Sequence, residues 1–447
     1  MDPRFLHHNT HQIDPKEFEN GDPQLRYLKK QPYVFRSKLI TEFPVDIPGI
    51  YTLSGGRQIG KTTLLKQWML ELLHKPIDPA CIAFLSGELI SDQFTLLHLL
   101  QRQLDSMPQE RLKYLILDEV NYIQDWDKTI KYAADAGMLD QTVLFLSGSD
   151  TSFIKEARMR FPGRRGRSAI VDFHFYPLSF REVVFLKCNL RSSDDATDDM
   201  LYKEFQSYLI HGGFMTAIND MAQNNAISDA TLTTYSDWIR GDMLKRGKHE
   251  HYLREIILAI LKRYTSQVTW ISLSKDQSID HPQTIIDYVS LLEEMDAVFV
   301  QKALIEDELS GAPKKARKIY FTDPFIYHAL YAWIYPDRNA YEKQIKPLLS
   351  NPESCAQQVE ACTVTHYRRY YPTYYIKGEG EVDIAYLNAN TFWPVEVKWT
   401  NQLRSKDLKQ LAKYRNSLLL TKTNEQGQIN GIPTFPLPRA LFSLDGK

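Results

Sequence analysis

The first part of the chain alternates short apolar runs with a longer segment of helical periodicity. The runs GIYTLS, YLILD and TVLFLS are continuous, which is typical of strands that are buried on both faces of a parallel sheet. After the first run, TTLLKQWMLELLHK has apolar residues at helical spacing and ends before Pro76. The pattern predicts an α/β domain over residues 41–180, preceded by an amino-terminal segment of residues 1–40.

After residue 180 the pattern becomes mainly helical. Residues 181–250 are polar and helical in pattern, and they would form a helical lid. Residues 251–340 then contain two amphipathic helices, within YLREIILAILKRY and HPQTIIDYVSLLEEMDAV, followed by two alternating strands, VFVQKAL and RKIYFTD. Two helices followed by a two-stranded ribbon predict a winged helix-turn-helix.

The predicted winged helix has candidate contacts to nucleic acid. Three residues at the start of the second helix would contact base edges: His281, Gln283 and Thr284. Four basic residues of the wing would contact phosphates: Lys314, Lys315, Arg317 and Lys318. Acidic residues on the same helix, Glu293, Glu294 and Asp296, would repel phosphate. A winged helix that serves only as a packing module is therefore the alternative.

The carboxy-terminal region, residues 345–447, contains two alternating strands around the turn NANT. With the turn centred on its two middle residues, Asp383 lies opposite Glu396, and Lys398 lies on the same face. Opposed carboxylates repel each other unless a cation lies between them, so this face predicts a site for a divalent metal such as Mg²⁺. The alternative is an amphipathic hairpin with a surface pair between Glu381 and Lys398.

Composition narrows the class of protein. A chain of 447 residues exceeds the size of a single core, and 43% hydrophobic with 24% charged residues is typical of soluble globular proteins. No apolar run approaches about 20 residues, and MDPRFLHHNTHQ lacks the apolar core of a secretory signal, so we expect a cytoplasmic protein without a membrane partner. Four scattered cysteines exclude a disulfide framework, and a net charge of −1 restricts nucleic-acid contacts to local patches.

The stretch SGGRQIGKTT, between the first predicted strand and helix, matches G-x-x-x-x-G-K-[ST]. Such a loop surrounds phosphates with backbone N–H groups, and the helix N-terminus adds its positive dipole end. The residues expected to bind ATP here are Gly55, Gly56, Arg57, Gln58, Ile59, Gly60, Lys61, Thr62 and Thr63. Among them Lys61 would contact the β- and γ-phosphates, and Thr62 would bind Mg²⁺.

The run YLILD is followed by a second carboxylate, so the strand ends in Asp118 and Glu119. Since the carboxyl ends of parallel strands meet the ligand, Asp118 would hold Mg²⁺ and Glu119 would polarise the attacking water. The next strand ends near Ser147 and Ser149. Either serine could contact the γ-phosphate or cap a helix expected at 150–154.

Arginines are concentrated in ARMRFPGRRGR, at Arg158, Arg160, Arg164, Arg165 and Arg167. One of them could act as an arginine finger, a group worth about 10³ to 10⁵ in rate. A solvated run of charges is the alternative.

Five stretches together resemble the bacterial and archaeal AAA-type ATPases that carry a restriction-endonuclease-like carboxy-terminal domain: GGRQIGKTTLL, LILDEVNYIQDW, LFLSGSDTSF, PGRRGRSAIVDFHFYPLSFREV and YLIHGGFMTAI. Members commonly have proline where this chain has Gly56 and Met215, and neither change removes a phosphate or metal ligand. The resemblance implies an AAA-type P-loop NTPase core in which Arg164 or Arg165 acts near the nucleotide.

The resemblance also implies that residues 345–447 form a small α/β PD-(D/E)XK nuclease-like domain. Asp383, Glu396 and Lys398 then have the D…E-x-K arrangement, and Glu360 matches the upstream glutamate of the family. The expected metal ligands are Glu360, Asp383 and Glu396, while Lys398 would orient water or screen phosphate.

Two further stretches could contribute to nucleic-acid binding in this region. The segment HYRRYYPTYY interleaves arginines with tyrosines that could stack on bases, although such tyrosines more often pack in cores. In the segment KDLKQLAKYR, three lysines at helical spacing would lie on one face and could contact phosphates: Lys406, Lys409 and Lys413.

Two functions of different classes fit these observations. The first is a Mg²⁺-dependent, homo-oligomeric AAA-type ATPase that acts on nucleic acid, DNA rather than RNA, through the winged helix and a metal-dependent nuclease-like domain. The second is an ATP-dependent regulatory switch or scaffold whose nuclease-like domain is inert. The intact D…E-x-K set favours the first function, whereas the neutral overall charge and the acidic winged helix favour the second.

Overall fold

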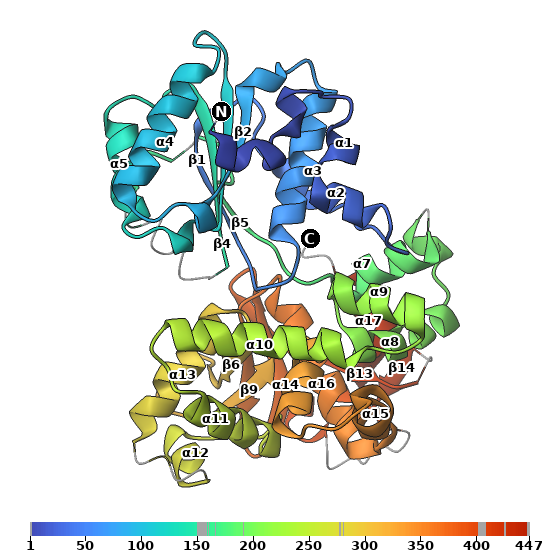
Figure 1. Ribbon diagram of the computed structural model, residues 1–447. Helices are drawn as coiled ribbons and strands as arrows, with labels where there is room; N and C mark the ends of the chain where they lie inside the picture. Colours follow the sequence, from blue (N-terminus) through green and yellow to red (C-terminus); the bar gives the residue numbers. More distant parts are fainter. Residues whose placement is uncertain are drawn as a thin grey trace. The chain divides into compact units, whose positions relative to one another are not determined.

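The structure is a computed structural model that describes residues 2–149, 159, 161–165, 167–190, 192–276, 279, 281–400, 408–423 and 426–444. It divides into two compact units, Met1–Tyr176 and Pro177–Lys447, called unit 1 and unit 2 below (Figure 1). Each unit has its own sheet and is considered by itself.

Unit 1 is an α/β domain whose described strands form a parallel sheet in the order β2-β3-β4-β1-β5. The strands are β1 (Gly49–Ser54), β2 (Ile82–Ser86), β3 (Lys113–Asp118), β4 (Thr142–Gly148) and β5 (Asp172–His174). The helices described in this unit are α1 (Phe18–Gly21), α2 (Pro23–Leu28), α3 (Lys61–His74), α4 (Gln93–Ser106) and α5 (Trp126–Asp135). The three strands predicted from continuous apolar runs are confirmed as β1, β3 and β4.

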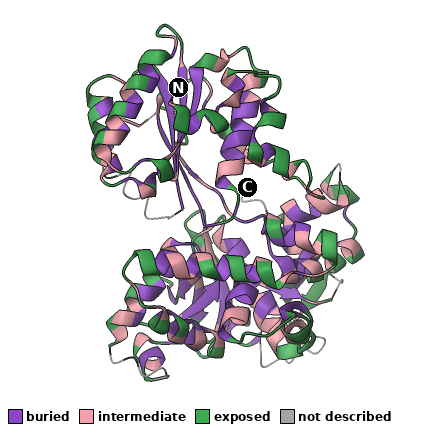
Figure 2. Cartoon of the chain, viewed as in Figure 1, coloured by how far each residue is buried: buried purple, intermediate pink, exposed green. Residues whose placement is uncertain are grey.

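Helices on both faces explain why these strands are continuously apolar. Leu144 and Leu146 of β4 belong to a core that includes Leu96 of α4 and Ile130 of α5. Phe145, which alternates with them, contacts Trp68 of α3 at a ring distance of 5.0 Å. Strands β3 and β4 are therefore buried along their whole length, as Figure 2 shows for this sheet.

The amino-terminal segment is part of unit 1 and covers the edge strand β2. Asn9 bonds both backbone groups of Phe84, accepting from its N–H at 2.7 Å and donating to its carbonyl at 2.8 Å. The side chains of His11 and Gln12 contact the carbonyl of Ile82 at 3.0 and 2.9 Å. Side chains thus satisfy backbone groups that an exposed edge strand would leave unpaired.

A fully buried ion pair joins the same segment to helix α3. Lys66 Nζ lies 2.9 Å from the carboxylate of Asp22, and both side chains are 0% exposed. The ammonium also donates to the carbonyl of His8 at 2.6 Å and lies 4.1 Å from the centre of the Phe84 ring. Burial lowers the pKa of Lys66, while the charge of Asp22 opposes this shift.

Unit 2 contains a mixed sheet in which the described strands have the order β10-β11-β12-β13-β15-β14. These strands are β10 (Thr373–Lys377), β11 (Glu381–Asn388), β12 (Thr391–Lys398), β13 (Leu418–Thr421), β14 (Gly427–Ile429) and β15 (Ile432–Pro436). Strand β11 is antiparallel to both β10 and β12, and β13 is parallel to β12 and β15.

The hairpin β11–β12 has the register that the sequence predicts. Ile384 pairs with Val395, and Asn388 pairs with Thr391. The two turn residues, Ala389 and Asn390, have φ values of 48° and 57°. Both are left-handed, as a two-residue hairpin turn with the twist of its strands requires.

Helices make up most of the rest of unit 2. They are α7 (Phe180–Cys188), α8 (Asp198–His211), α9 (Met215–Asn224), α10 (Asp229–Lys245), α11 (Glu250–Lys262), α12 (Trp270–Asp276), α13 (Pro282–Glu294), α14 (Pro324–Ile334), α15 (Lys346–Ser350), α16 (Pro352–Arg368) and α17 (Leu437–Ser443). A search of the described helices finds none with the length and apolar character needed to cross a bilayer.

The predicted lid, winged helix and carboxy-terminal region all lie within unit 2. Phe180 N–H, at the start of α7, donates to His366 Nε2 of α16 at 3.0 Å. Arg181 donates to the carbonyl of Phe442 at 2.8 Å. These contacts join segments far apart in the sequence, and the boundaries between the three predicted domains stay predictions.

A two-stranded ribbon follows helices α11 to α13, in the predicted order. It consists of β6 (Val298–Lys302) and β9 (Arg317–Phe321), which are antiparallel, and the short strands β7 (Leu304–Ile305) and β8 (Ser310–Gly311) lie between them in the sequence. The ribbon contacts the mixed sheet through a bridge between Ala303 and Tyr375.

Candidate functional site

The glycine-rich loop of unit 1 connects β1 to the first residue of α3, Lys61. Gly55 has φ 151°, and a Cβ at this position would lie 2.3 Å from the carbonyl oxygen of Phe175. Glycine is therefore required where the loop leaves the strand. The predicted context of strand, glycine loop and helix is confirmed, with the N-terminus of α3 at the end of the loop.

The side chain of Lys61 is folded back onto this loop. Its ammonium donates to the carbonyl oxygens of Gly55 at 3.0 Å and Gly56 at 2.9 Å, and it lies 3.8 Å from the carboxylate of Glu119. Only 5% of the side chain is exposed. The positive charge of Lys61 thus lies beside the N-terminus of α3. An anionic ligand bound there would be stabilised by the ammonium and by the positive end of the helix dipole.

Thr62, Asp118 and Ser147 form a connected set that joins α3, β3 and β4. Thr62 Oγ1 donates to one carboxylate oxygen of Asp118 at 2.7 Å, and Ser147 Oγ donates to the other. Ser147 Oγ also accepts from the backbone N–H of Glu119 at 3.0 Å. Of the two serines proposed from the sequence, Ser147 is the one that fixes the acidic pair, while Ser149 is buried beyond the end of β4.

Glu119 has two unusual features. Its φ of 52° lies in the left-handed region, which costs energy for a residue other than glycine. Its Oε2 atom is buried and has no hydrogen-bond partner among the described residues. A buried carboxylate oxygen without a donor is suited to accept a proton or to bind a cation.

Gly87, at the end of β2, is a residue of this site that the sequence analysis missed. A Cβ there would lie 2.4 Å from the carbonyl oxygen of Glu119 and 3.0 Å from that of Asp118. Glycine lets the backbone after β2 approach the acidic pair. In the sequence, Gly87 is marked only by its position directly after an apolar run, and this is weak evidence for a residue of the site.

The remaining predicted loop residues take varied positions. The guanidinium of Arg57 donates to the hydroxyl of Tyr122 at 3.2 Å, and Ile59 is buried. Gln58 is exposed with φ 62°, and Thr63 is half-buried in the first turn of α3.

Both proposed finger arginines are paired within unit 1. Arg164 contacts the carboxylate of Asp135 and donates to the carbonyl of Pro162 at 3.1 Å. Arg165 contacts Asp172 and donates to the carbonyl of Val171 at 3.1 Å. Arg164 is the more exposed of the two, at 27% against 12%. Arg158, Arg160 and the helix expected at 150–154 lie outside the described residues.

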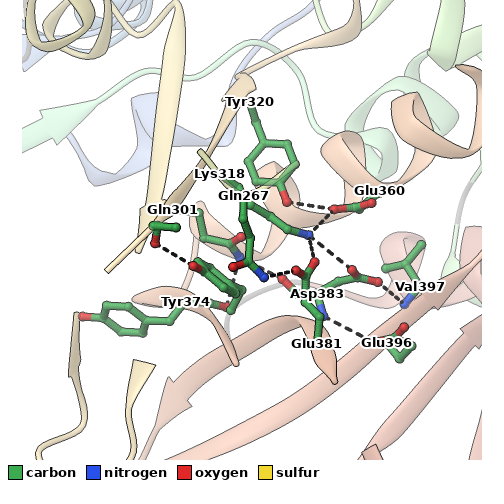
Figure 3. A network of polar contacts seen from close by, with 12 residues as sticks. Gln267, Gln301, Lys318, Tyr320, Glu360, Tyr374, Glu381, Asp383, Glu396 and Val397 are labelled. Atoms are coloured by element: carbon green, nitrogen blue, oxygen red, sulfur yellow. Dashed lines mark hydrogen bonds and ion pairs between the residues drawn. The ribbon is translucent and has the colours of Figure 1, made fainter. Parts of the chain in front are cut away.

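Unit 2 contains a cluster of carboxylates around one lysine, shown in Figure 3. Lys318 Nζ, from β9, lies 2.8 Å from Glu360 of α16 and 3.5 Å from Asp383 of β11, and it contacts Glu381. The Lys318 side chain is only 2% exposed. Tyr320, two residues along the same strand, donates to Glu360 at 2.9 Å.

The hairpin supplies the second half of this cluster. Asp383 N–H donates to Glu396 at 3.3 Å, and Asp383 accepts from Val397 N–H at 3.0 Å. Lys398 Nζ lies 2.6 Å from Glu396. The structure thus brings together the four predicted residues Glu360, Asp383, Glu396 and Lys398. Glu381 forms an ion pair with Lys318, and the alternative surface pair between Glu381 and Lys398 is not formed.

Burial and mutual repulsion change the ionisation of this cluster. Burial, and then the charge of Asp383, raise the pKa of Glu360 to about 7 and that of Glu396 to about 8. Although burial disfavours the charged form of Lys318, the acidic groups around it raise the pKa of its ammonium well above the ordinary value.

The placement of Lys318 corrects one prediction from the sequence. We expected it in an exposed wing facing phosphate, but it is buried against carboxylates. Strand alternation is the reason, because Lys318 and Tyr320 share the face of β9 that packs on α16. Within the described parts of the chain, no group of three or more His, Cys, Asp or Glu side chains has an arrangement that could hold a metal ion.

Other residues proposed to touch nucleic acid are divided between surface and core. Gln283 is exposed at the start of α13 and bonds Asp287 at 2.8 Å, and Lys314 is exposed. In the tyrosine-rich segment Tyr367 and Tyr375 are buried, while Tyr370 is 37% exposed. Lys413 pairs with Glu379 at 2.9 Å, and Lys406 lies outside the described residues.

Comparison with known families identifies the first of these two regions. Residues 48–184 match a family model described as an AAA domain, and residues 202–336 match a domain of unknown function, DUF8612. No curated protein matches the chain.

Several solved structures are similar to parts of the chain. The Walker-type ATPase paby2304 of Pyrococcus abyssi is 15% identical, with 71% of this chain and 95% of that chain covered, at a TM-score of 0.44. Cdc6p from Pyrobaculum aerophilum is 15% identical, with coverages of 75% and 96%, at a TM-score of 0.28. Drosophila ORC bound to DNA is 12% identical, with coverages of 71% and 86%, at a TM-score of 0.25.

These TM-scores are too low to carry a conclusion, so the assignment depends on the family match and on the geometry of the loop. The match begins one residue before β1 and includes the loop, both acidic residues and Ser147. Residues 48–184 therefore match an AAA domain and contain a P-loop of the expected geometry.

Proposed function

We propose that the protein is a Mg²⁺-dependent ATP hydrolase. The observation that carries this proposal is the connected set of Lys61, Thr62, Asp118, Ser147 and Glu119 at the carboxyl edge of the parallel sheet. In P-loop enzymes these residue types bind phosphate, hold the metal and activate water.

The donor set fits Mg²⁺. The Thr62 hydroxyl and the Asp118 carboxylate are 2.7 Å apart and offer the oxygen ligands that this ion prefers. Once bound, Mg²⁺ would neutralise developing phosphate charge. The protein would supply the rest: Lys61 would leave the carbonyls of its own loop for the β- and γ-phosphates, and Glu119 would accept a proton from the attacking water.

Replacing Lys61 with alanine is expected to weaken ATP binding about 10- to 100-fold, because the charge-assisted hydrogen bonds of its ammonium to phosphate are lost. Calorimetric titration with ATP and Mg²⁺ measures this effect. Lys75→Ala, at an exposed lysine just after the same helix, is the matched control and should bind as the wild type does. Equal affinity of Lys61→Ala and wild type would show that the loop does not hold the phosphates in this way.

We also propose that an arginine acts across subunits of a homo-oligomer. Arg164 is favoured over Arg165 because it is less buried and its partner Asp135 is itself 47% exposed. Such a pair is easily exchanged for a phosphate of a neighbouring subunit.

For unit 2 we propose a winged helix in residues 251–340 and a restriction-endonuclease-like domain in residues 345–447, acting on nucleic acid and on DNA in preference to RNA. The specific observation in favour is that Asp383, Glu396, Lys398 and Glu360 come from two strands and a helix to one place. As arranged, the carboxylates do not fit a divalent ion, because the ammonium of Lys318 lies among them.

If unit 2 is a nuclease, the protein should cleave DNA in the presence of Mg²⁺ and ATP, and Glu396→Gln should remove cleavage while ATP turnover persists. Gel assays of single- and double-stranded DNA and RNA, with and without ATP, measure this. Glu379→Gln, at a glutamate that is 84% exposed, is the matched control and should cleave normally. No cleavage of any substrate by the wild type would favour the regulatory switch or scaffold.

A further inference from the structure

The ammonium of Lys318 lies at the centre of the carboxylate cluster of unit 2 (Figure 3). It is 2.8 Å from Glu360, 3.5 Å from Asp383 and in contact with Glu381, and it is almost completely buried. A buried cation surrounded by carboxylates takes the place that a metal ion takes in sites of this composition.

The lysine comes from a different part of unit 2 than the carboxylates do. Lys318 belongs to β9 of the ribbon, whereas Asp383 and Glu396 belong to the hairpin β11–β12. Gln301, on the partner strand β6, holds the ribbon in place, because its side-chain amide donates to the carbonyls of Tyr374 at 3.0 Å and Asp383 at 2.9 Å. The ribbon therefore contacts both the backbone and the side chain of Asp383.

The oxygens of the two hairpin carboxylates already have partners. Asp383 interacts with Lys318 through Oδ1 and with Val397 N–H through Oδ2. Glu396 interacts with Lys398 through Oε1 and with Asp383 N–H through Oε2. A divalent ion would have to replace Lys318, since a second cation at this position would be repelled by the ammonium.

We propose that the carboxylates of this cluster do not hold a divalent cation in this protein, because Lys318 is their internal counter-ion and occupies the place of the metal. The inference rests on the proposed function of the nuclease-like domain and adds that Lys318, and not a metal ion, neutralises its carboxylates.

Calorimetric titration of the complete chain with Mn²⁺, without nucleotide, tests this proposal. Lys318→Met should bind Mn²⁺ at least tenfold more tightly than the wild type, because the competing cation is removed and a neutral chain of similar length remains. Lys302→Met, at an exposed lysine of strand β6 in the same ribbon, is the matched control and should bind as the wild type does. In the double variant Lys318→Met/Asp383→Asn the added binding should be lost.

Thermal unfolding gives a second measurement that does not depend on activity. Lys318→Met should unfold at a lower temperature than the wild type without metal, because the carboxylates lose their counter-ion, and Mn²⁺ should raise its midpoint. Should Lys318→Met not fold, Lys318→Met/Glu381→Gln removes one charge of each sign and leaves the three proposed ligands in place. It should also bind Mn²⁺ more tightly than the wild type.

The outcomes separate this inference from the proposed function. Tight Mn²⁺ binding by the wild type that Lys318→Met does not improve and Asp383→Asn abolishes would overturn the role of Lys318 and keep the metal site. Absence of Mn²⁺ binding in every folded variant, Lys318→Met included, would overturn the proposed metal site and with it the inference that Lys318 keeps a divalent ion out.

Discussion

Glu119→Gln is expected to slow ATP hydrolysis by about 10² or more while leaving ATP affinity unchanged. The amide cannot take a proton from the attacking water, and general bases of this kind contribute about 10²- to 10⁴-fold in rate. The orphaned Oε2 of Glu119 and its left-handed backbone support this role. Because Asp118 and Thr62 are untouched, the binding of Mg²⁺ and nucleotide should persist.

Single-turnover hydrolysis and a binding titration on the same preparation measure the two quantities separately. Glu88→Gln, an exposed glutamate after β2, is the matched control and should hydrolyse ATP at the wild-type rate. A wild-type rate in Glu119→Gln would refute the assignment of the base. A loss of both affinity and rate would indicate that Glu119 positions Lys61, whose ammonium lies 3.8 Å away.

Asp22→Asn is expected to destabilise unit 1 by about 3 to 5 kcal/mol, the usual cost of leaving one member of a buried ion pair without its partner. Asparagine keeps an oxygen that can accept from the N–H groups of Gln24 and Leu25, as Asp22 does at 3.0 and 3.1 Å. The change therefore removes the charge opposite Lys66 and retains the cap of helix α2.

Denaturant unfolding of the complete chain, followed by a probe in unit 1, measures this loss. The double variant Asp22→Asn/Lys66→Met should recover a large part of the stability, because no charge is then buried alone. Asp14→Asn, at an exposed aspartate of the same segment, should change stability by less than about 0.5 kcal/mol. Equal effects of Asp14→Asn and Asp22→Asn would show that the ion pair does not stabilise the fold.

Features encoded by neighbouring residues were predictable from the sequence. Strands β1, β3 and β4 follow from continuous apolar runs, because a strand covered by helices on both faces tolerates few polar residues. The loop before Lys61 follows from glycine spacing, since Gly55 and Gly60 have backbone angles that glycine adopts most easily. The register of hairpin β11–β12 follows from a two-residue turn, which fixes the pairs from Asn388–Thr391 to Ile384–Val395.

Features that need partners far apart in the chain were not predictable. The edge of β2 is covered by Asn9, which lies 75 residues before Phe84, and no local pattern marks Asn9 as such a partner. In the sequence, Lys318 is one of four basic residues of a predicted wing. Only the packing of β9 against α16 shows that its side chain is buried.

The sequence by itself therefore determined the glycine-rich loop between β1 and α3, the acidic end of β3, and a hairpin register that brings Asp383 next to Glu396. Only the tertiary structure decided which cation these carboxylates contact. The physical reason is that backbone angles and strand alternation are local properties, whereas the burial of a charge depends on groups that folding brings together from distant segments. A lysine in the sequence can pair with solvent, with phosphate or with a carboxylate, and the fold selects the carboxylates for Lys318.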